Sequence, residues 1–411
     1  MEVFATGADV AAALRPDEPV YCFRPRVLVD DAKAFSTAFP GTTAYAVKTN
    51  GEAMVLKALS GAGIGAFDVA SPAEFAAARA ASPRAELFYM HPVKAESHIR
   101  LALERYGIHT LVADHEDEVA KVQAVVKKLG IDPAGLRLFV RLATKGHAAY
   151  ELSKKFGAAP AHAVEIVQRA GRAGFQVGLC FHVGSQVEDL TTYERALASA
   201  AWVRSRAGVE IAALDIGGGF PARYAASGRR AAAAAPPDPA RLLADILNEI
   251  REWGLDDLPL IAEPGRVIVA RAFSVIVRVL LRKGRRLYIN DGIWSSLSDS
   301  WTGKITLPAR HLPDVEARTR RKRSEIVPFR VMGATCDSVD ILSRPFYLPE
   351  KVTDGDWIEI GHIGAYSMAL RTHFNGFYPN TFVEVTTPFE DAEAGPAEGS
   401  AAIESMAEAA G

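Results

Sequence analysis

The chain has 411 residues, 49% hydrophobic and 23% charged, which is enough apolar material for one large and one smaller globular core. Its 47 Lys and Arg residues nearly balance 49 Asp and Glu residues, which excludes a general attraction to nucleic acid or anionic membranes. The widely spaced Cys22, Cys180 and Cys336 exclude a disulfide framework and a paired-cysteine zinc site. With neither a leader-like N-terminus nor an apolar run of membrane-spanning length, we expect a two-domain cytoplasmic protein without a bound metal.

Short apolar or β-branched runs alternate with alanine-rich, helix-like stretches from Gly41 to Arg266. The strand candidates are Ala44–Lys48, Gly65–Ala70, Leu87–His91, His109–Ala113, Leu136–Leu142, Gln176–His182, Ala212–Ile216 and Pro259–Glu263. Strands separated by helices without a long break fit a closed (β/α)8 barrel better than an open doubly wound sheet.

Polar residues gather at one end of these predicted strands. They lie at or just past the C-terminal ends: Lys48, Asp68, His91, Arg141, His182, Gly217–Gly219 and Glu263. Barrel enzymes place their sites on that face, so the pattern predicts an active site there.

The pattern changes after Arg266, where strands are joined by Gly, Pro and Asp turns with little helix between them. The predicted strands are Phe273–Leu281, Arg286–Asn290, Ile326–Met332, Trp357–Gly361 and Phe382–Thr386, and Tyr21–Val29 is also strand-like. We therefore predict an N-terminal arm (1–30) that pairs into a mainly β domain (271–389), with the barrel at 31–270. We interpret Ala222–Pro239 as a mobile loop and residues 390–411 as a disordered tail.

Lys48 ends the first barrel strand, in Thr43-Ala-Tyr-Ala-Val-Lys48. An amine at a strand-to-helix turn is well placed to form a Schiff base with an aldehyde cofactor or a carbonyl substrate. Taken alone, one lysine is a weak signal, and this stretch by itself favours a surface residue that ends a strand.

The loops after the last two barrel strands predict a phosphate site. Asp215-Ile-Gly-Gly-Gly219 exposes backbone N–H groups as an anion-binding turn requires, and Glu263-Pro-Gly-Arg266 adds a cation beside it. A carboxylate at Glu263 holds a pyridine nitrogen protonated. The alternatives are a tight turn for the glycines and a capping or salt-bridge carboxylate for Glu263.

His182-Val-Gly-Ser185 follows the sixth barrel strand. Its imidazole is placed to stack on an aromatic cofactor and its hydroxyl to bind a phosphate. An ordinary core histidine is the alternative for His182.

The ordered motifs resemble one known family over nearly the whole chain, from about Val20 to Val385. They are Ala46-Val-Lys48, Phe67-Asp-Val-Ala-Ser71, His182-Val-Gly-Ser185, Asp215-Ile-Gly-Gly-Gly219, Glu263-Pro-Gly-Arg266, Cys336-Asp337, Gly364-Ala-Tyr366 and Phe374-Asn-Gly-Phe377. The chain resembles the fold-type III pyridoxal-phosphate decarboxylases of the ornithine decarboxylase group, whose barrel is alanine-racemase-like.

The resemblance implies roles for the barrel residues. Lys48 would bind pyridoxal phosphate as a Schiff base, Glu263 would pair with the ring nitrogen, and His182 would stack on the ring. The implied phosphate-binding and supporting residues are Ser185, Gly217, Gly218, Gly219, Gly265, Arg266 and Tyr366, with Asp68 and Arg141 near the lysine and ring.

The resemblance also implies a homodimer with shared active sites. In the family, the loop that matches Cys336 enters the site of the other subunit, where the cysteine protonates the product carbanion. Asp337 would accept a hydrogen bond from the distal ammonium of the substrate, and Lys155 and Asp340 resemble an ion pair across the dimer interface. Read without the family, Cys336 is an inert β-domain cysteine.

The implied reaction is decarboxylation of a basic L-amino acid, with ornithine as the first choice and lysine as the second. Asp299 is a further candidate for the distal ammonium, although its segment, Ile293 to Lys304, departs from the usual pattern of the group. A diaminopimelate decarboxylase is less favoured; it would need a cation such as Arg310 or Arg371.

Two other functions are less favoured by the sequence. The carboxylate of Glu263 argues against an alanine racemase, because that branch sets an arginine against the ring nitrogen. A catalytically silent regulatory homologue is a different class of function, and the presence of Lys48 and Cys336 disfavours it.

Overall fold

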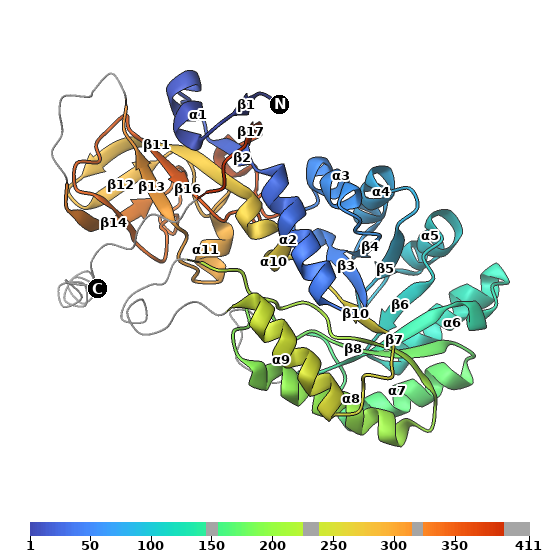
Figure 1. Ribbon diagram of the computed structural model, residues 1–411. Helices are drawn as coiled ribbons and strands as arrows, with labels where there is room; N and C mark the ends of the chain where they lie inside the picture. Colours follow the sequence, from blue (N-terminus) through green and yellow to red (C-terminus); the bar gives the residue numbers. More distant parts are fainter. Residues whose placement is uncertain (145–154, 225–237, 315–323, 390–411) are drawn as a thin grey trace. The chain divides into compact units, whose positions relative to one another are not determined.

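The computed structural model describes residues 1–144, 155–224, 238–314 and 324–389 (Figure 1). The chain divides into two compact units. The first comprises Met1–Val27, Arg223–Pro237 and Ala270–Gly411, and the second comprises Leu28–Ala222 and Asp238–Val269, each within the described residues. Most of the loop expected at Ala222–Pro239 and the whole tail from residue 390 lie outside the described residues.

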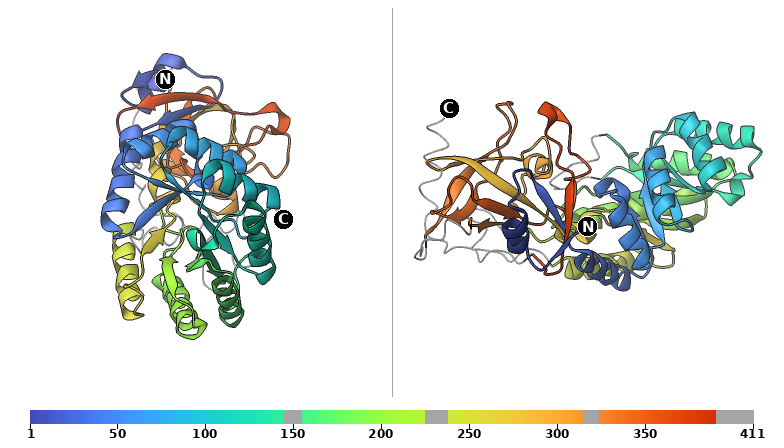
Figure 2. Two further views of the ribbon diagram at one scale, coloured as in Figure 1. Left: turned by 90° about the vertical axis from the view of Figure 1, so that its right-hand side faces the viewer. Right: turned by 90° about the horizontal axis from the view of Figure 1, so that it is seen from above.

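The second unit is a closed barrel of parallel strands, as the sequence predicts. Its strands are β3 (Thr42–Ala46), β4 (Ala66–Val69), β5 (Glu86–Tyr89), β6 (Thr110–Ala113), β7 (Arg137–Leu142), β8 (Gln176–Phe181), β9 (Ile211–Asp215) and β10 (Leu260–Ala262). The barrel closes because β10 pairs with both β9 and β3. Figure 2 shows the helices on the outside of these strands.

One helix precedes the first barrel strand, and one follows each of the barrel strands. They are α2 (Pro25–Ala38), α3 (Ala53–Gly61), α4 (Pro72–Ala81), α5 (Glu96–Tyr106), α6 (Glu116–Leu129), α7 (Pro160–Arg172), α8 (Leu190–Ala207), α9 (Pro239–Glu252) and the short α10 (Arg266–Val269). The side chain of Asp189 caps α8 by accepting a hydrogen bond from Thr191 N–H. Gly107 and Gly130 end α5 and α6 in the left-handed conformation that glycine adopts without strain.

The packed interior of the barrel explains where its polar residues lie. One cluster of buried side chains comes from all the barrel strands: Ala44, Ala66, Phe88, Met90, Val112, Phe139, Cys180, Ala213 and Ile261. Side chains two residues apart on a strand share a face. Asp68, Arg141, His182, Asp215 and Glu263 each come two residues after a member of this cluster. They therefore form the next layer, toward the C-terminal ends of the strands.

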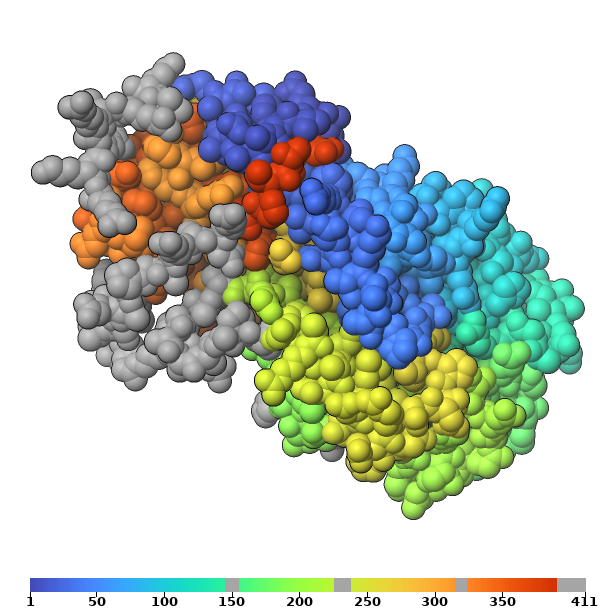
Figure 3. Space-filling view, in the orientation of Figure 1, coloured from blue at the N-terminus to red at the C-terminus, as the bar shows by residue number. Residues whose placement is uncertain are grey.

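The first unit contains a mixed sheet. Its strands are β1 (Val3–Phe4), β2 (Val20–Phe23), β11 (Phe273–Lys283), β12 (Arg286–Ile289), β13 (Ala309–Leu312), β14 (Ile326–Met332), β15 (Phe346–Pro349), β16 (Trp357–Ile360) and β17 (Thr381–Val385). β2 pairs antiparallel with β11 and parallel with β17, so the N-terminal segment is part of this sheet. Figure 3 shows the dark blue N-terminal residues beside the red β17, with which β1 pairs.

One predicted strand is too long. The expected strand Tyr21–Val29 ends at Phe23, and helix α2 begins at Pro25. Proline has a fixed φ and no N–H, so it suits the first position of a helix and interrupts a strand. The sequence prediction also missed β1, β13, β15, and the helices α1 (Gly7–Leu14) and α11 (Ser298–Thr302).

Among the described helices, none combines the length and the apolar character that crossing a membrane requires.

Candidate active site

Lys48 is held by a carboxylate from the neighbouring strand. It lies in the single 3-10 turn Val47–Thr49 directly after β3, and its Nζ is 2.7 Å from Asp68 Oδ2. The register that pairs Ala46 with Asp68 brings the two side chains together. The Lys48 side chain is 38% exposed, whereas that of Asp68 is 3% exposed, so a buried acid orients an accessible amine.

Glu263 follows β10 and lies beside a second buried acid, Asp215, at the end of β9. Burial, followed by the carboxylates of Asp215 and Asp68, raises the pKa of Glu263 well above its usual value, and Lys48 offsets part of this effect. Burial likewise raises the pKa of Asp215 to about 7. Within the described residues, Glu263 forms no ion pair with a basic side chain. This acid is therefore suited to hold a proton at a basic ring nitrogen.

The glycine loop after β9 packs against the loop after β8. A side chain at Gly217 would start 2.2 Å from Phe181 O, and Gly217 and Gly219 both have positive φ, at 67° and 106°. Val187 N–H donates to Gly219 O at 2.9 Å. Glycine is required here by close approach and by backbone conformation together.

A buried cation adjoins these loops. Arg266 begins α10, is 3% exposed, and donates from Nε to Ser185 Oγ at 3.2 Å. The preceding Gly265 has no room for a side chain, because its Cβ would lie 2.1 Å from Thr49 Oγ1. The guanidinium, the hydroxyl and the glycine loop are the donor types that bind a phosphate group.

His182 is a neutral imidazole at the end of β8. Burial, with the cations Lys48 and Arg141, lowers its pKa well below the usual value. Its Nδ1 accepts a hydrogen bond from Gly184 N–H at 3.2 Å, which assigns the proton to Nε2. Arg141 is half-buried on β7, and its guanidinium carbon lies 5.6 Å from the centre of the Phe156 ring.

His91 is less central than the strand-end pattern predicts. It follows β5, is half-buried, and its ring centre lies 5.5 Å from that of Phe156. Burial and nearby cations, Lys94 first, lower its pKa.

The remaining predicted site residues, Tyr366, Cys336, Asp337 and Asp299, belong to the β unit. Tyr366 is half-buried with φ at 55°, and Asp299 is buried in α11. Cys336 is exposed, whereas Cys22 and Cys180 are buried. Asp337 Oδ1 accepts a hydrogen bond from Val339 N–H at 3.0 Å.

Three charged residues that the sequence assigned to interfaces or ligands have partners within the β unit. Asp340, expected in an ion pair with Lys155, accepts hydrogen bonds from Ile293 N–H at 2.9 Å and Thr335 N–H at 2.9 Å. Arg310 donates from Nε to Glu359 Oε2 at 2.8 Å. Arg371 donates to Pro379 O at 3.0 Å. The two arginines proposed as cations for a distal carboxylate thus have partners within the β unit.

Comparison with known proteins identifies the family. The model for the pyridoxal-binding domain of the pyridoxal-dependent decarboxylases matches residues 26–270. The chain belongs to the pyridoxal-dependent decarboxylases. The resemblance inferred from the sequence, the barrel and the pyridoxal phosphate cofactor are thereby confirmed.

Relatives and solved structures cover most of the chain. It is 32% identical over 352 residues to the chloroplastic ornithine decarboxylase of Nicotiana glutinosa, covering 82% of this chain and 77% of the relative. Antizyme inhibitor 2 of Xenopus laevis is 31% identical over 362 residues, covering 81% and 73%. The lysine/ornithine decarboxylase of Vibrio vulnificus, solved in complex with putrescine, superimposes with a TM-score of 0.75 at 27% identity, covering 93% and 99%.

The barrel residues fit pyridoxal phosphate. A buried acid with a raised pKa suits the ring nitrogen, a neutral buried imidazole suits the face of the ring, and Lys48 presents an accessible amine. Side chains on Gly217, Gly218 or Gly219 would collide with the loops after β8 and β10, and Arg266 and Ser185 supply a cation and a hydroxyl from those same loops. Together these groups match the ring nitrogen, the aldehyde and the phosphate of one small molecule.

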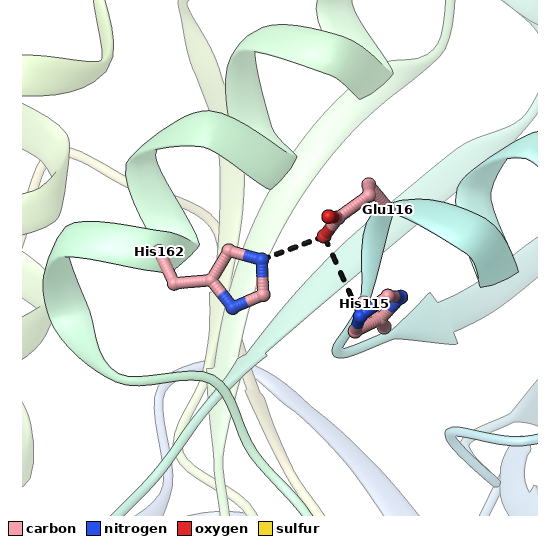
Figure 4. A group of neighbouring side chains, drawn as sticks. All are labelled: His115, Glu116 and His162. Carbon is pink, nitrogen blue, oxygen red and sulfur yellow. Dashed lines mark hydrogen bonds and ion pairs between the residues drawn. The ribbon is translucent and has the colours of Figure 1, made fainter.

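One group of described residues brings three potential metal ligands together: His115, Glu116 and His162, whose donor atoms lie within 4.8 Å of one another (Figure 4). His162 Nε2 is 2.6 Å from Glu116 Oε2. His115 Nδ1 accepts a hydrogen bond from Asp117 N–H as the cap of α6, which leaves the ring proton on Nε2, the nitrogen nearer Glu116. The contact between Glu116 and His162 joins the start of α6 to α7.

Sequence reasoning missed the part that Asp215 takes in the site. The motif that contains it was recognised for its glycines, whereas Asp215 Oδ1 fixes the loop by accepting a hydrogen bond from Gly217 N–H at 2.7 Å. An acid at the end of an apolar strand and two residues before the first of three glycines was the available signal.

Proposed function

We propose that the chain decarboxylates a basic L-amino acid to the corresponding diamine, with L-ornithine as the preferred substrate, putrescine as the product and L-lysine as the second choice. The observation that carries the proposal is the pairing of an accessible amine at Lys48 with a buried, proton-holding acid at Glu263 on one barrel face. The sequence similarity to ornithine decarboxylase of Nicotiana glutinosa supports ornithine as the substrate.

Pyridoxal phosphate, when bound, supplies an aldehyde that reacts with amines and a ring that accepts the electron pair left when carbon dioxide departs. Lys48 carries the reacting amine, and Asp68 orients it from 2.7 Å. Glu263 would hold a proton at the ring nitrogen, because burial and neighbouring carboxylates raise its own pKa. Neutral His182 adds no positive charge that would compete with that proton.

Selectivity for a basic side chain requires an acid for its distal ammonium. Burying an unpaired ammonium would cost several kcal/mol, on the order reported for broken buried ion pairs. Asp337, beside Cys336, keeps Oδ2 as an acceptor while Oδ1 binds Val339 N–H. Asp299, buried in α11, is the second candidate.

The active enzyme is a homodimer in this proposal. Large apolar side chains are exposed close to Cys336 along the chain and on the segment that includes Asn375, to which the Cys336 N–H donates: Val339 at 46%, Leu370 at 45%, Phe374 at 44%, and Phe377 and Tyr378 each at 36%. Such a patch is typical of a surface that another protein covers. A second copy seated there would bring Cys336 of the partner subunit to the barrel face that carries Lys48.

The substrate is tested by comparing kcat/KM for L-ornithine, L-lysine, L-arginine and meso-diaminopimelate, with product identified directly. We expect ornithine to give the highest value and lysine the next. A preference for diaminopimelate would contradict the assignment of Asp337, because a zwitterionic end needs a cation as well as an acid.

The shared site is tested by mixing two inactive variants, Lys48→Ala and Cys336→Ala. Subunit exchange should restore activity toward one quarter of the wild-type value, since mixed dimers contain one intact site. Recovery of no activity would contradict the shared site, and sedimentation of each variant alone would show whether either fails to dimerise.

A regulatory role without catalysis is the second candidate, because antizyme inhibitor 2 of Xenopus laevis is 31% identical. The presence of Lys48 and Cys336 favours an enzyme. Diamine formation by the purified protein would decide between them.

We also infer a cytoplasmic location from the exposed free thiol of Cys336, which a reducing compartment preserves. Cell fractionation is the test.

A further inference from the structure

The turn that carries Cys336 is fixed by a buried acid. In this segment, the Cys336 turn (Gly333–Asp340), the side chain of Asp340 is buried, and its Oδ2 accepts from Thr335 N–H at 2.9 Å and Thr335 Oγ1 at 2.6 Å. Its Oδ1 accepts from Ile293 N–H at 2.9 Å. One carboxylate therefore ties the residue before Cys336 to the loop that follows β12.

Cys336 itself is held by Asn375. The backbone N–H of Cys336 donates to Asn375 Oδ1 at 3.0 Å. Asn375 has φ at 52° and ψ at 14°, within the turn Phe374–Gly376. This left-handed conformation costs most residues about 1–2 kcal/mol, and glycine and asparagine tolerate it best. Asparagine, unlike glycine, also supplies a side-chain acceptor. The left-handed backbone and the hydrogen bond to Cys336 N–H together therefore specify asparagine at this position.

The segment that contains Asn375 is anchored to the same loop as Asp340. Thr372 donates to Trp294 O from its backbone N–H at 3.0 Å and from Oγ1 at 2.9 Å. The same hydroxyl oxygen accepts from Phe374 N–H at 3.2 Å. Ile293 thus binds the Cys336 turn through Asp340, and Trp294 binds the segment of Asn375 through Thr372. Because Asn375 in turn binds Cys336, hydrogen bonds link each of the three segments to the other two.

We propose that Asn375 is a positioning residue that sets the direction from which Cys336 delivers its proton. The inference rests on the proposed function, in which the bond to the carboxyl carbon breaks, carbon dioxide leaves and Cα takes the proton of the Cys336 thiol. The thiolate then regains a proton from water. A donor fixed on one side of Cα gives a single stereochemical outcome, whereas a loose turn lets protons arrive from either side.

Two substitutions separate the hydrogen bond from the backbone conformation. Asn375→Gly removes the acceptor and keeps the left-handed backbone accessible, and Asn375→Asp keeps both an acceptor oxygen and that tolerance. Arg15→Gly is the matched control, because Arg15 is another left-handed residue of the same unit, with φ at 44°, and ends helix α1.

The first measurement is decarboxylation in D2O. The wild type, Arg15→Gly and Asn375→Asp should place deuterium at one position of the diamine carbon, whereas Asn375→Gly should give a mixture of both. We expect kcat of Asn375→Gly to fall about tenfold to hundredfold with KM nearly unchanged, the loss typical of a misplaced reacting group. The second measurement needs no substrate: the amide hydrogen of Cys336 should exchange faster in Asn375→Gly than in the other proteins.

Two results would overturn the inference. Single-sided deuteration by Asn375→Gly would show that the hydrogen bond does not aim the thiol, as would an equal loss in Asn375→Gly and Asn375→Asp. A separate control tests the underlying function: if Cys336→Ala keeps both the rate and the stereochemistry, Cys336 is not the donor, and the proposal fails for that reason.

Discussion

Asp68 Oδ2 lies 2.7 Å from Lys48 Nζ, with the acid buried and the amine accessible. The contact joins the ends of two adjacent barrel strands and fixes the direction of the reacting amine. Because the acid is enclosed and the lysine is not, the pair orients the lysine more than it stabilises the barrel.

Asp68→Asn should slow the attachment of pyridoxal phosphate, because the lysine side chain loses the charge that holds it in place. We expect the attachment rate constant to fall about tenfold to hundredfold, the range for a misplaced reacting group. Stopped-flow absorbance on cofactor-free protein measures it. Asp257→Asn, which breaks an exposed ion pair with Arg204 in the same unit, should attach the cofactor at the wild-type rate; attachment by Asp68→Asn at that rate would refute the orienting role.

Glu263→Gln should stabilise the cofactor-free protein at neutral and higher pH. The pKa of Glu263 is raised in the folded chain, so folding takes up a proton. The contribution of Glu263 to the free energy of unfolding is most favourable below the pKa of the unfolded carboxyl group, about 4.3. That contribution is lost as the pH rises through the pKa of Glu263 in the folded protein. We expect the wild type to lose stability relative to the variant between pH 4 and pH 9, because glutamine does not titrate and the glutamate must release its proton.

The same substitution should inactivate the enzyme with cofactor bound, because glutamine cannot hold a proton at the ring nitrogen. We expect kcat to fall about a hundredfold or more, as for loss of a preorganised electrostatic partner. Urea unfolding and steady-state kinetics measure the two effects, and Glu252→Gln on the exposed end of α9 serves as control. If Glu263→Gln lowered both the stability of the cofactor-free protein and the activity of the enzyme, Glu263 would be an ordinary structural acid.

Gly218→Ala should weaken cofactor binding without unfolding the barrel. A Cβ at this position would lie 2.7 Å from Glu263 O and 3.0 Å from His182 Nε2, so the backbone or the imidazole must move. Such overpacking costs about 1–3 kcal/mol, and we expect the Kd for pyridoxal phosphate to rise at least about tenfold. The control is Gly65→Ala at the start of β4, where a Cβ meets no atom within 4 Å. Equal affinity in the two variants, measured by fluorescence titration, would contradict the tight fit.

The barrel was predictable because local patterns specify it. Each short apolar run is bounded by turn and cap residues, and every observed barrel strand lies within about two residues of its predicted range, the usual accuracy for boundaries. The polar layer was predictable for the same reason. Asp68 and Glu263 follow the last core residues of their strands at the period that keeps them on the inner face.

The β unit was less predictable because its pairing is long-range. β1 pairs with β17 through Val3 and Glu384, and nothing local indicates that partner. Strand β13 has the sequence Ala-Arg-His-Leu, without strand-like alternation, and it pairs with β16, a strand distant in the sequence, with Arg310 opposite Glu359. Motif comparison pointed to an interface ion pair for Asp340, and it could not indicate that the same carboxylate accepts from backbone N–H groups of Ile293 and Thr335, because Ile293 comes from a turn that is distant in the sequence.

Glu359→Gln should destabilise the β unit strongly. Glu359 is fully buried and accepts from Arg24 Nη2 at 2.8 Å, from Ser274 Oγ at 2.6 Å and from Arg310 Nε at 2.8 Å. Removing its charge leaves the guanidinium of Arg24 buried without a counter-charge, a change that costs about 3–5 kcal/mol. Urea unfolding followed by tryptophan fluorescence reports on the unit, since Trp357 is buried in its core.

An exposed ion pair of the same unit provides the matched control for Glu359. Glu350 contacts Arg285 at 2.9 Å, with side chains 49% and 43% exposed. Glu350→Gln should shift the unfolding free energy by less than about 1 kcal/mol, because water solvates both partners and screens their attraction. If the two variants unfold at the same urea concentration, the buried network around Glu359 contributes no more than a surface pair, and its charges must be satisfied in another way.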